Sequence, residues 1–274
     1  MADSIRASKI TEYLWSAEHC KKYLPLPKSS DHKYRRGVLC CITGSKKYPG
    51  AALLTTASAI SVGIGMVRYV GPKSVAKAVI QNRAEVVLAK GAVDAYLLGS
   101  GISNEGISLQ RSRMSRVKKE TKPVVLDAGA LYLAGKIDSP TIITPHSGEL
   151  GRLLDRSASE IDRDRNKYAV EAAKKFHVTV LLKGSETIVT NGSQLIELPI
   201  ATSWLSTAGT GDVLAGILGA LLAINHRDLN HNNLIEVGAT AAFIHAAAAK
   251  LIDGPISPTK LIESIPNVIK DLSK

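Results

Sequence analysis

Short apolar runs alternate with helical patterns along most of this 274-residue chain, and this alternation restricts the possible folds more than any other feature. Each run leads into a loop that contains glycine, aspartate or histidine. Strands separated by helices predict an α/β fold: a mostly parallel central sheet with helices on both faces, in three layers. The predicted strands are 38–42, 66–70, 95–98, 124–127 and 141–143, and the predicted helices between them are 51–62, a basic helix at 111–119, and 149–154.

The second half of the chain follows a different pattern. Runs at 178–182, 187–189 and 195–198 are rich in β-formers, and Asn191-Gly192 lies between the last two. Asn-Gly is a typical hairpin turn, so these runs predict antiparallel pairing. The remainder predicts helices at 211–225 and roughly 234–252, and a short helix after Pro258.

No linker or internal repeat divides the chain, so we expect one domain. Residues 1–36 are polar and mixed, and Pro25 and Pro27 indicate an extended N-terminal lead-in segment. The single catalytic domain is predicted to occupy residues 37–274.

The formal net charge of +11 fits nucleic acid, a membrane surface or small polyanions as ligands. The densest basic run, 111–119, contains no aromatic residue, which favours a solvated helix face over nucleic-acid binding. The apolar stretch 50–67 is broken by Thr, Ser and Gly, so no membrane span is predicted. The excess of positive charge fits an enzyme whose ligands carry phosphate groups.

The three cysteines are expected to be buried core thiols, because Cys40 and Cys41 lie inside an apolar run and, with Cys20, match no metal-site spacing. The N-terminus shows no apolar signal segment. We therefore expect a cytoplasmic protein in a reducing compartment.

Ligands of open α/β sheets bind outside the carboxyl ends of the strands. The loops at 43–52, 99–102, 127, 144–149, 183–187 and 207–212 follow predicted strands or open a predicted helix. We expect them to form one site.

The segment Gly209-Thr210-Gly211-Asp212 opens a helix and is predicted to bind an anion. Two glycines allow a tight turn, and the unpaired N–H groups of a first helical turn attract phosphate. Asp212 could accept a proton from a substrate hydroxyl that attacks phosphorus, or it could simply cap the helix. The sequence contains neither a P-loop motif nor a Gly-x-Gly-x-x-Gly fingerprint after the first strand.

Three other loops carry candidate residues. His146 could bond a ligand, Ser147 could cap the helix that follows, and Glu149 could be the acidic residue of its first turn. The loop 183–187 could present backbone groups to a nucleotide or be an ordinary turn. Asp127 could bind a magnesium-bound water or cap the next segment.

Together these motifs resemble the ADP/ATP-dependent NAD(P)H-hydrate dehydratase family of the ribokinase-like superfamily. The resemblance extends from about Gly37 nearly to the C-terminus. It is carried by residues 44–52 (Gly-Ser-Lys-Lys-Tyr-Pro-Gly-Ala-Ala), 125–128 (Val-Leu-Asp-Ala), 144–149 (Thr-Pro-His-Ser-Gly-Glu), 182–184 (Leu-Lys-Gly) and 208–217 (Ala-Gly-Thr-Gly-Asp-Val-Leu-Ala-Gly-Ile).

The resemblance implies a ribokinase-like sandwich and a lyase that repairs hydrated NADH and NADPH. ADP or ATP would phosphorylate the C6 hydroxyl of the hydrate, and expulsion of phosphate with loss of the C5 proton would restore the ring. Asp212 would be the base. Mg²⁺ would bridge the phosphates, its protein ligands being unknown, and the enzyme would be a homo-oligomer, a tetramer.

The resemblance also assigns positions in the site. The implied nucleotide contacts are Lys183, Gly184, Ser185, Glu186, Thr187, Gly209, Thr210 and Gly211. The implied hydrate contacts are Ala51, Ala52, Gly101, His146 and Asp212.

The sequence departs from the family pattern at the metal and substrate edge of the implied site. Ser100 stands where the family usually has Pro, Gly129 where it has Asp, and Tyr132 where it has Asn. A small-molecule kinase of the same superfamily, acting on a vitamin-precursor alcohol, is the alternative enzyme. A nucleotide-binding regulator without catalysis is the alternative from another class.

Overall fold

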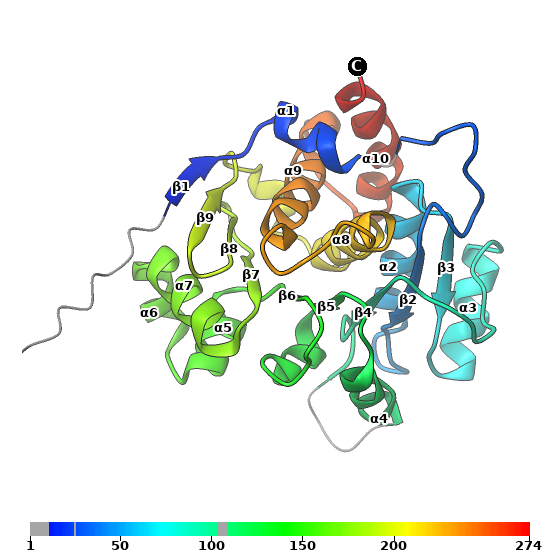
Figure 1. Cartoon of the computed structure of the whole chain (residues 1–274), viewed down its shortest axis with the longest axis horizontal. Helices are drawn as coiled ribbons and strands as arrows, with labels where there is room; N and C mark the ends of the chain where they lie inside the picture. The colour runs from blue at the N-terminus through cyan, green and yellow to red at the C-terminus, as the bar shows by residue number, and fades with distance from the viewer. Residues whose placement is uncertain (1–10, 25, 104–108) are drawn as a thin grey trace, which may run out of the picture.

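A computed structural model describes residues 11–24, 26–103 and 109–274 of the chain. In these residues one sheet runs through the molecule in the order β1-β9-β8-β7-β6-β5-β4-β2-β3 (Figure 1). Its strands are β1 (Thr11–Leu14), β2 (Val38–Ile42), β3 (Met66–Tyr69), β4 (Ala95–Leu98), β5 (Val124–Leu126), β6 (Thr141–Ile143), β7 (Thr179–Leu182), β8 (Ile188–Thr190) and β9 (Gln194–Glu197).

The pairing confirms the predicted sheet. Strands β2 to β7 pair in parallel with their neighbours, while β8 is antiparallel to both β7 and β9. The central strands β2, β5 and β6 are buried throughout, as continuous apolar runs covered on both faces should be. The loops after β2, β4, β5 and β6 therefore share one edge.

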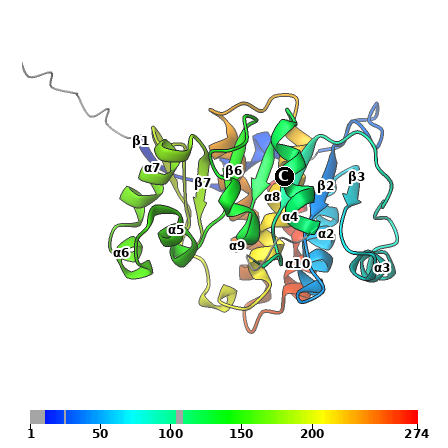
Figure 2. The same cartoon turned by 90° about the horizontal axis from the view of Figure 1, so that it is seen from below.

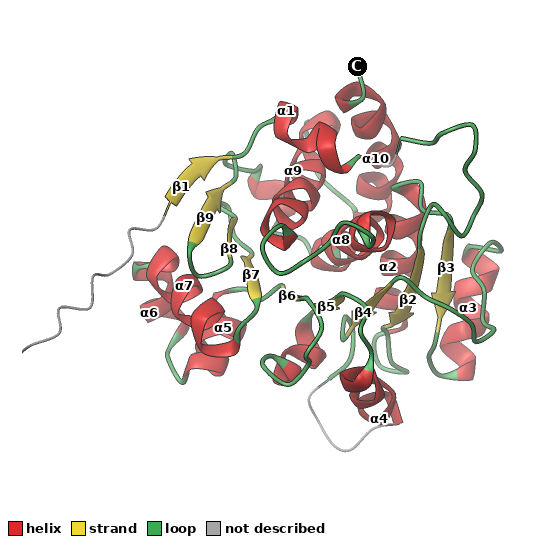
Figure 3. Ribbon diagram, viewed as in Figure 1, coloured by secondary structure: helices red, strands yellow, loops and turns green. Residues whose placement is uncertain are grey.

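Helices cover both faces of the sheet, giving the predicted three-layer α/β/α sandwich (Figure 3). One layer holds α2, α8, α9 and α10, and the opposite layer, seen in front in Figure 2, holds α4, α5, α6 and α7. The helices are α1 (Ala17–Cys20), α2 (Pro49–Ser61), α3 (Lys73–Asn82), α4 (Leu109–Arg116), α5 (Ser147–Leu154), α6 (Ala158–Arg163), α7 (Arg165–Phe176), α8 (Thr210–Asn225), α9 (Leu234–Ile252) and α10 (Pro258–Leu272).

Two apolar clusters fill the spaces between the layers. Helices α8 and α9 are apolar around most of their circumference, because they lie between the sheet and other helices. By length and composition alone α9 could cross a membrane, but 61% of its apolar window is buried inside the protein. Its hydropathy is that of a core helix. The free cysteines Cys20, Cys40 and Cys41 are buried, as predicted.

The N-terminal segment contains structure that the sequence did not predict. Strand β1 pairs in parallel with β9, and Trp15 and Tyr23 are buried in the core. A four-residue strand at a sheet edge is too short to show clear periodicity. Residues 1–10 and Pro25 of the expected lead-in lie outside the described residues.

The prediction of a short helix after Pro258 was wrong in length. Helix α10 has 15 residues and buries Leu261, Ile262, Ile265 and Val268 along one face. Pro266 lies inside it, where proline usually indicates a helix end. Packing against α2 and α9 outweighs that cost.

Candidate active site

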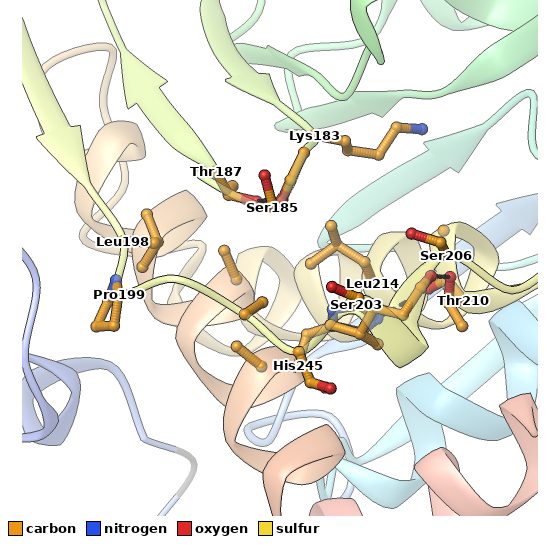
Figure 4. A pocket seen from close by; sticks show the side chains of 17 residues that line it. Lys183, Ser185, Thr187, Leu198, Pro199, Ser203, Ser206, Thr210, Leu214 and His245 are labelled. Carbon is orange, nitrogen blue, oxygen red and sulfur yellow. Dashed lines mark hydrogen bonds between the residues drawn. The ribbon is translucent and has the colours of Figure 1, made fainter. Parts of the chain in front are cut away.

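A pocket of about 200 Å³ lies between the loop after β7 and the N-terminus of α8 (Figure 4). Its walls bring together residues that the resemblance assigned to the nucleotide: Lys183, Gly184, Ser185, Thr187, Thr210 and Gly211. Glu186 faces the two neighbouring hollows instead. Gly209 contributes through the shape of the turn.

The remaining wall was not identified from the sequence. The loop at 198–206 encloses one side of the pocket, and His245 of α9 lies at its base. The Nε2–H of His245 donates to the carbonyl oxygen of Thr210 at 2.9 Å. Burial lowers the pKa of His245 to about 4, so this donor is a neutral imidazole that fixes the first turn of α8.

The turn before α8 requires Gly209. Its φ of +94° is a left-handed conformation, and a Cβ there would lie 2.8 Å from Leu54 Cδ1 and 2.9 Å from Pro258 Cγ. The Thr210 hydroxyl donates to the carbonyls of Leu205 and Thr207 at 2.8 and 2.9 Å. These contacts hold the turn that begins α8, where Thr210 and Gly211 line the pocket.

Gly209, and not Asp212, is the N-cap of α8, so the interpretation of Asp212 as a cap is excluded. Asp212 lies in the first turn, and in the described part of the chain its carboxylate forms no hydrogen bond or ion pair. Burial, followed by the charge of Asp127, raises the pKa of Asp212 to about 7, and Lys183 partly offsets the rise. A half-buried carboxylate with this pKa can accept a proton near neutral pH.

Lys183 lies in a buried group of charges beside Asp212. Its Nζ is 3.0 Å from Asp127 Oδ1 and 3.7 Å from Glu149 Oε2, and a Cβ on Gly211 would lie 3.8 Å away. Burial lowers the pKa of Lys183, but the negative charges of Asp127 and Glu149 raise it by more, so the pKa of the ammonium lies above its usual value. Lys183 is therefore a fixed cation at the N-terminus of α8.

Asp127 occupies the N-cap position of the 3₁₀ helix Ala128–Leu133, but its side chain makes no capping hydrogen bond. Its Oδ1 accepts from Lys183 and, at 2.8 Å, from the Thr144 hydroxyl, while Oδ2 accepts from the Ser100 hydroxyl at 2.8 Å. Each oxygen of this buried carboxylate thus has a partner. Ser100, a departure from the family pattern, supplies one of them.

The described residues contain no group of three His, Cys, Asp or Glu side chains that could hold a metal ion. Magnesium needs few protein ligands, since it keeps waters and binds substrate phosphates with one or two carboxylates. Asp212, which directly follows the pocket residue Gly211, fits that limited role, whereas both oxygens of Asp127 are already hydrogen-bonded.

The residues expected to contact the hydrate lie in two separate places. A Cβ on Gly101 would lie 2.3 Å from the Cβ of Ala51, and one on Gly44 would lie 2.7 Å from the Cβ of Ala52. The loop after β4 therefore packs on the start of α2, with no room for larger side chains. His146 lies apart from them, beside Gly184 and Ser185.

The expectation that Ser147 caps α5 was wrong. His146 is the N-cap: its Nδ1 accepts from the Gly148 N–H at 3.0 Å, and Glu149 accepts from the His146 N–H at 2.9 Å. Ser147 binds Asp162 instead. Serine is the commoner cap, so the sequence pattern favoured the wrong residue.

Arg165, at the start of α7, braces the loop after β7. Its Nη2 donates to the carbonyls of Leu182, Lys183 and Glu186, and its Nη1 donates to the Ser147 hydroxyl. A Cβ on Gly184 would lie 2.6 Å from Nη2. No local pattern identifies Arg165, because its role depends on the packing of α7 against the sheet.

Comparison with known proteins places the chain among related sequences. The family model described as NAD(P)H-hydrate dehydratase matches residues 39–267. The bifunctional NAD(P)H-hydrate repair enzyme Nnr of Mycobacterium leprae is 35% identical over 264 residues, covering 89% of this chain and 53% of the relative. The chain thus spans about half the length of such relatives. The ADP-dependent (S)-NAD(P)H-hydrate dehydratase of Nitrosopumilus maritimus is 30% identical over 93% of this chain and 96% of its own length.

Solved structures show the same fold. The ADP/ATP-dependent NAD(P)H-hydrate dehydratase of Bacillus subtilis, co-crystallised with ATP/Mg²⁺, superposes with a TM-score of 0.83 and 26% identity, covering 97% of this chain and 100% of that chain. A hydroxyethylthiazole kinase from Pyrococcus horikoshii reaches a TM-score of 0.63 at 20% identity, covering 93% and 95%. The second likeness concerns the fold alone, and both agree with the predicted ribokinase-like class.

Proposed function

The chain belongs to the NAD(P)H-hydrate dehydratase family, and from this membership we propose that it restores NADH and NADPH from their hydrates at the cost of a nucleotide. The observation that carries the proposal is the placement of Asp212. A carboxylate with a raised pKa lies in the first turn of α8 beside the cation Lys183, directly after Gly211, which lines a pocket of suitable position for a nucleotide.

In the proposed first step, Asp212 accepts the proton of the C6 hydroxyl as its oxygen attacks the terminal phosphorus of the nucleotide. The bond from that phosphorus to the bridging oxygen breaks, and the shortened nucleotide leaves. The first N–H groups of α8 and the Lys183 ammonium stabilise the negative charge on the transferring group. In the second step, the ring nitrogen lone pair expels phosphate from C6, and loss of the C5 proton restores the dihydronicotinamide.

The pocket between the β7 loop and α8 is the proposed nucleotide site. The loop 183–187 offers backbone groups to the base and ribose, and Arg165 keeps that loop in one conformation. The B. subtilis relative was co-crystallised with ATP/Mg²⁺, which supports ATP or ADP as co-substrate here. When bound, Mg²⁺ would neutralise part of the phosphate charge.

The kinase alternative shares the fold and the turn before α8, so the last step separates it from the dehydratase. A kinase would release a phosphorylated alcohol, whereas a dehydratase releases phosphate and a restored ring. Family membership favours the dehydratase, and the intact arrangement of Asp212 and Lys183 opposes the alternative of a regulator without catalysis.

A cytoplasmic location fits the three buried free thiols. The homotetramer stays a prediction that follows from the resemblance.

The test is incubation of hydrated NADH or NADPH with the protein, Mg²⁺ and either ADP or ATP. We expect dihydronicotinamide absorbance to return only when a nucleotide is present. No return with either nucleotide would contradict the proposed function. Phosphorylation of a vitamin-precursor alcohol in its place would establish the kinase.

A further inference from the structure

A further pocket, of about 400 Å³, is lined by residues of the loops after β2, β4 and β5 and of helices α4 and α5. We call it the Arg111–Arg152 pocket, after the two arginines that line it together with Tyr48, Ile102, Gly129 and Tyr132. The nucleotide pocket shares none of these residues.

This pocket adjoins the reaction centre. The carbonyl oxygen of Tyr48, on its wall, would lie 3.1 Å from a Cβ on Gly101, one of the implied hydrate contacts. Glu149 lines the pocket and also approaches Lys183 Nζ to 3.7 Å. A dinucleotide with its nicotinamide ring near Asp212 therefore has the Arg111–Arg152 pocket beside it.

The pocket walls carry more positive than negative charge. The guanidinium carbon of Arg111 lies 4.3 Å from the centre of the Tyr132 ring, and Arg152 is exposed on the last turn of α5. The carboxylate on the wall, Glu149, accepts from the His146 N–H and faces Lys183. The charge of Glu149 is therefore directed at Lys183. Stacking on Tyr132 orients the planar guanidinium of Arg111, and such a group suits a phosphate.

Two departures from the family pattern shape this pocket. A Cβ on Gly129 would lie 2.0 Å from the carbonyl oxygen of Ile102, so the usual Asp cannot fit beneath the loop after β4. The glycine removes a carboxylate that would repel phosphate. Tyr132, in place of the usual Asn, supplies the ring beneath Arg111.

We propose that the Arg111–Arg152 pocket binds a phosphate group of the dinucleotide substrate. This inference rests on the proposed function, since it assumes a hydrated NADH or NADPH at Asp212. The phosphate has two possible sources, the pyrophosphate bridge that both substrates carry and the 2′-phosphate that NADPH hydrate alone carries.

The test uses the full chain with Arg111→Gln and Arg152→Gln, and with Arg116→Gln as the matched control. Arg116 is exposed on the same helix as Arg111 and lies outside the pocket. KM is measured for both hydrates at saturating nucleotide, and the hydrates are also titrated onto each protein without nucleotide, when no turnover occurs. The KM for nucleotide and the melting temperature verify that each variant is folded.

Loss of a charge-assisted contact should raise KM and Kd for the hydrate by about tenfold or more in each pocket variant, with the KM for nucleotide and the control unchanged. An increase for both hydrates identifies the pyrophosphate, and an increase for NADPH hydrate alone identifies the 2′-phosphate. Unchanged values for both hydrates, with an active wild-type enzyme, would overturn the inference and leave the proposed function standing. An inactive wild-type enzyme would remove both.

Discussion

The charged cluster beside the turn at 209–212 and the Arg111–Arg152 pocket differ in how their polar groups are satisfied. In the cluster of Lys183, Asp127 and Glu149, every charge faces an opposite one, and Ser100 and Thr144 complete the shell of Asp127. In the Arg111–Arg152 pocket, Arg152 is exposed at the surface. The first region is preorganised for chemistry, and the second is open to a ligand.

The departures from the family pattern follow this division. Gly129 and Tyr132 lie in the open pocket, where a substitution changes what can bind. Ser100 touches the closed cluster, but its hydroxyl supplies a hydrogen bond to Asp127. In the proposed mechanism, the residues that carry the reaction are therefore kept, and the departures affect the surroundings of the substrate. Five experiments test this difference between the two regions.

The largest effect is expected from Asp212→Asn. Asparagine keeps the shape but cannot accept the proton, so turnover should fall by about 10³-fold, the usual range for a general base. Nucleotide binding should change little, because the carboxylate forms no bond that holds the turn. Single-turnover assays and nucleotide titration measure the two effects. Unchanged turnover would remove Asp212 from the mechanism.

Lys183→Met should affect both stability and catalysis. The substitution leaves Asp127 buried without its cation, which costs about 3 kcal/mol of unfolding free energy, and it removes a group that stabilises phosphoryl transfer. Denaturant unfolding measures the first effect and kcat the second.

The control is the double variant Lys183→Met/Asp127→Asn. It removes both charges, so it should regain most of the lost unfolding free energy but none of the activity. If the double variant is as unstable as Lys183→Met alone, then the pair of charges is not what stabilises this region.

The pH dependence should follow the raised pKa of Asp212. The base must be ionised, so kcat/KM should rise by about tenfold per pH unit below about pH 7 and level off above it. Asp127→Asn removes a negative charge beside Asp212 and should move the inflection to lower pH. A profile flat from pH 5 to 8 would contradict this assignment.

The same shift affects stability in the opposite direction. Because the folded-state pKa of Asp212 is raised, its stabilising contribution is complete below the unfolded value of 3.8 and is lost as pH rises through about 7. Asp212→Asn avoids that loss. The free energy of unfolding of this variant should therefore exceed that of the wild type by on the order of 1 kcal/mol at pH 8, allowing for partial exposure of the side chain. Below pH 4 the two should be equal.

The smallest effect is expected from Ser100→Ala. Asp127 loses one of three hydrogen bonds, so the unfolding free energy should fall by about 1 kcal/mol and kcat by a few-fold. Ser112→Ala, which is exposed on α4 and lacks that bond, is the control. An equal effect of the two substitutions would mean that the bond from Ser100 to Asp127 does not position the cluster.

The sequence predicted which loops meet at one edge of the sheet, because the carboxyl ends of parallel strands lie on the same side. It placed Lys183, Asp127 and Asp212 in those loops, and the structure brings them within reach of one another. It could not identify Arg165 or His245. Both act across elements distant in sequence, and neither lies in a recognisable motif.

Contacts between segments distant in sequence also explain where the fold differs from the one predicted from the sequence. Strand β1 exists because β9 offers an unpaired edge, and α10 continues past Pro266 because its apolar face is covered by α2 and α9. Ser147 is not the cap of α5 because its hydroxyl is bound to Asp162 and Arg165, which lie later in the chain. Contacts between segments distant in sequence are therefore involved in all three.

The central claim is that the turn at 209–212 transfers a phosphoryl group which then leaves as phosphate. The most direct measurement follows dihydronicotinamide absorbance and free phosphate together while the wild-type protein acts on hydrated NADPH with Mg²⁺ and nucleotide. We predict one phosphate released for each ring restored, and neither product with Asp212→Asn. Absorbance that returns without phosphate, or phosphate released without a restored ring, would contradict the account.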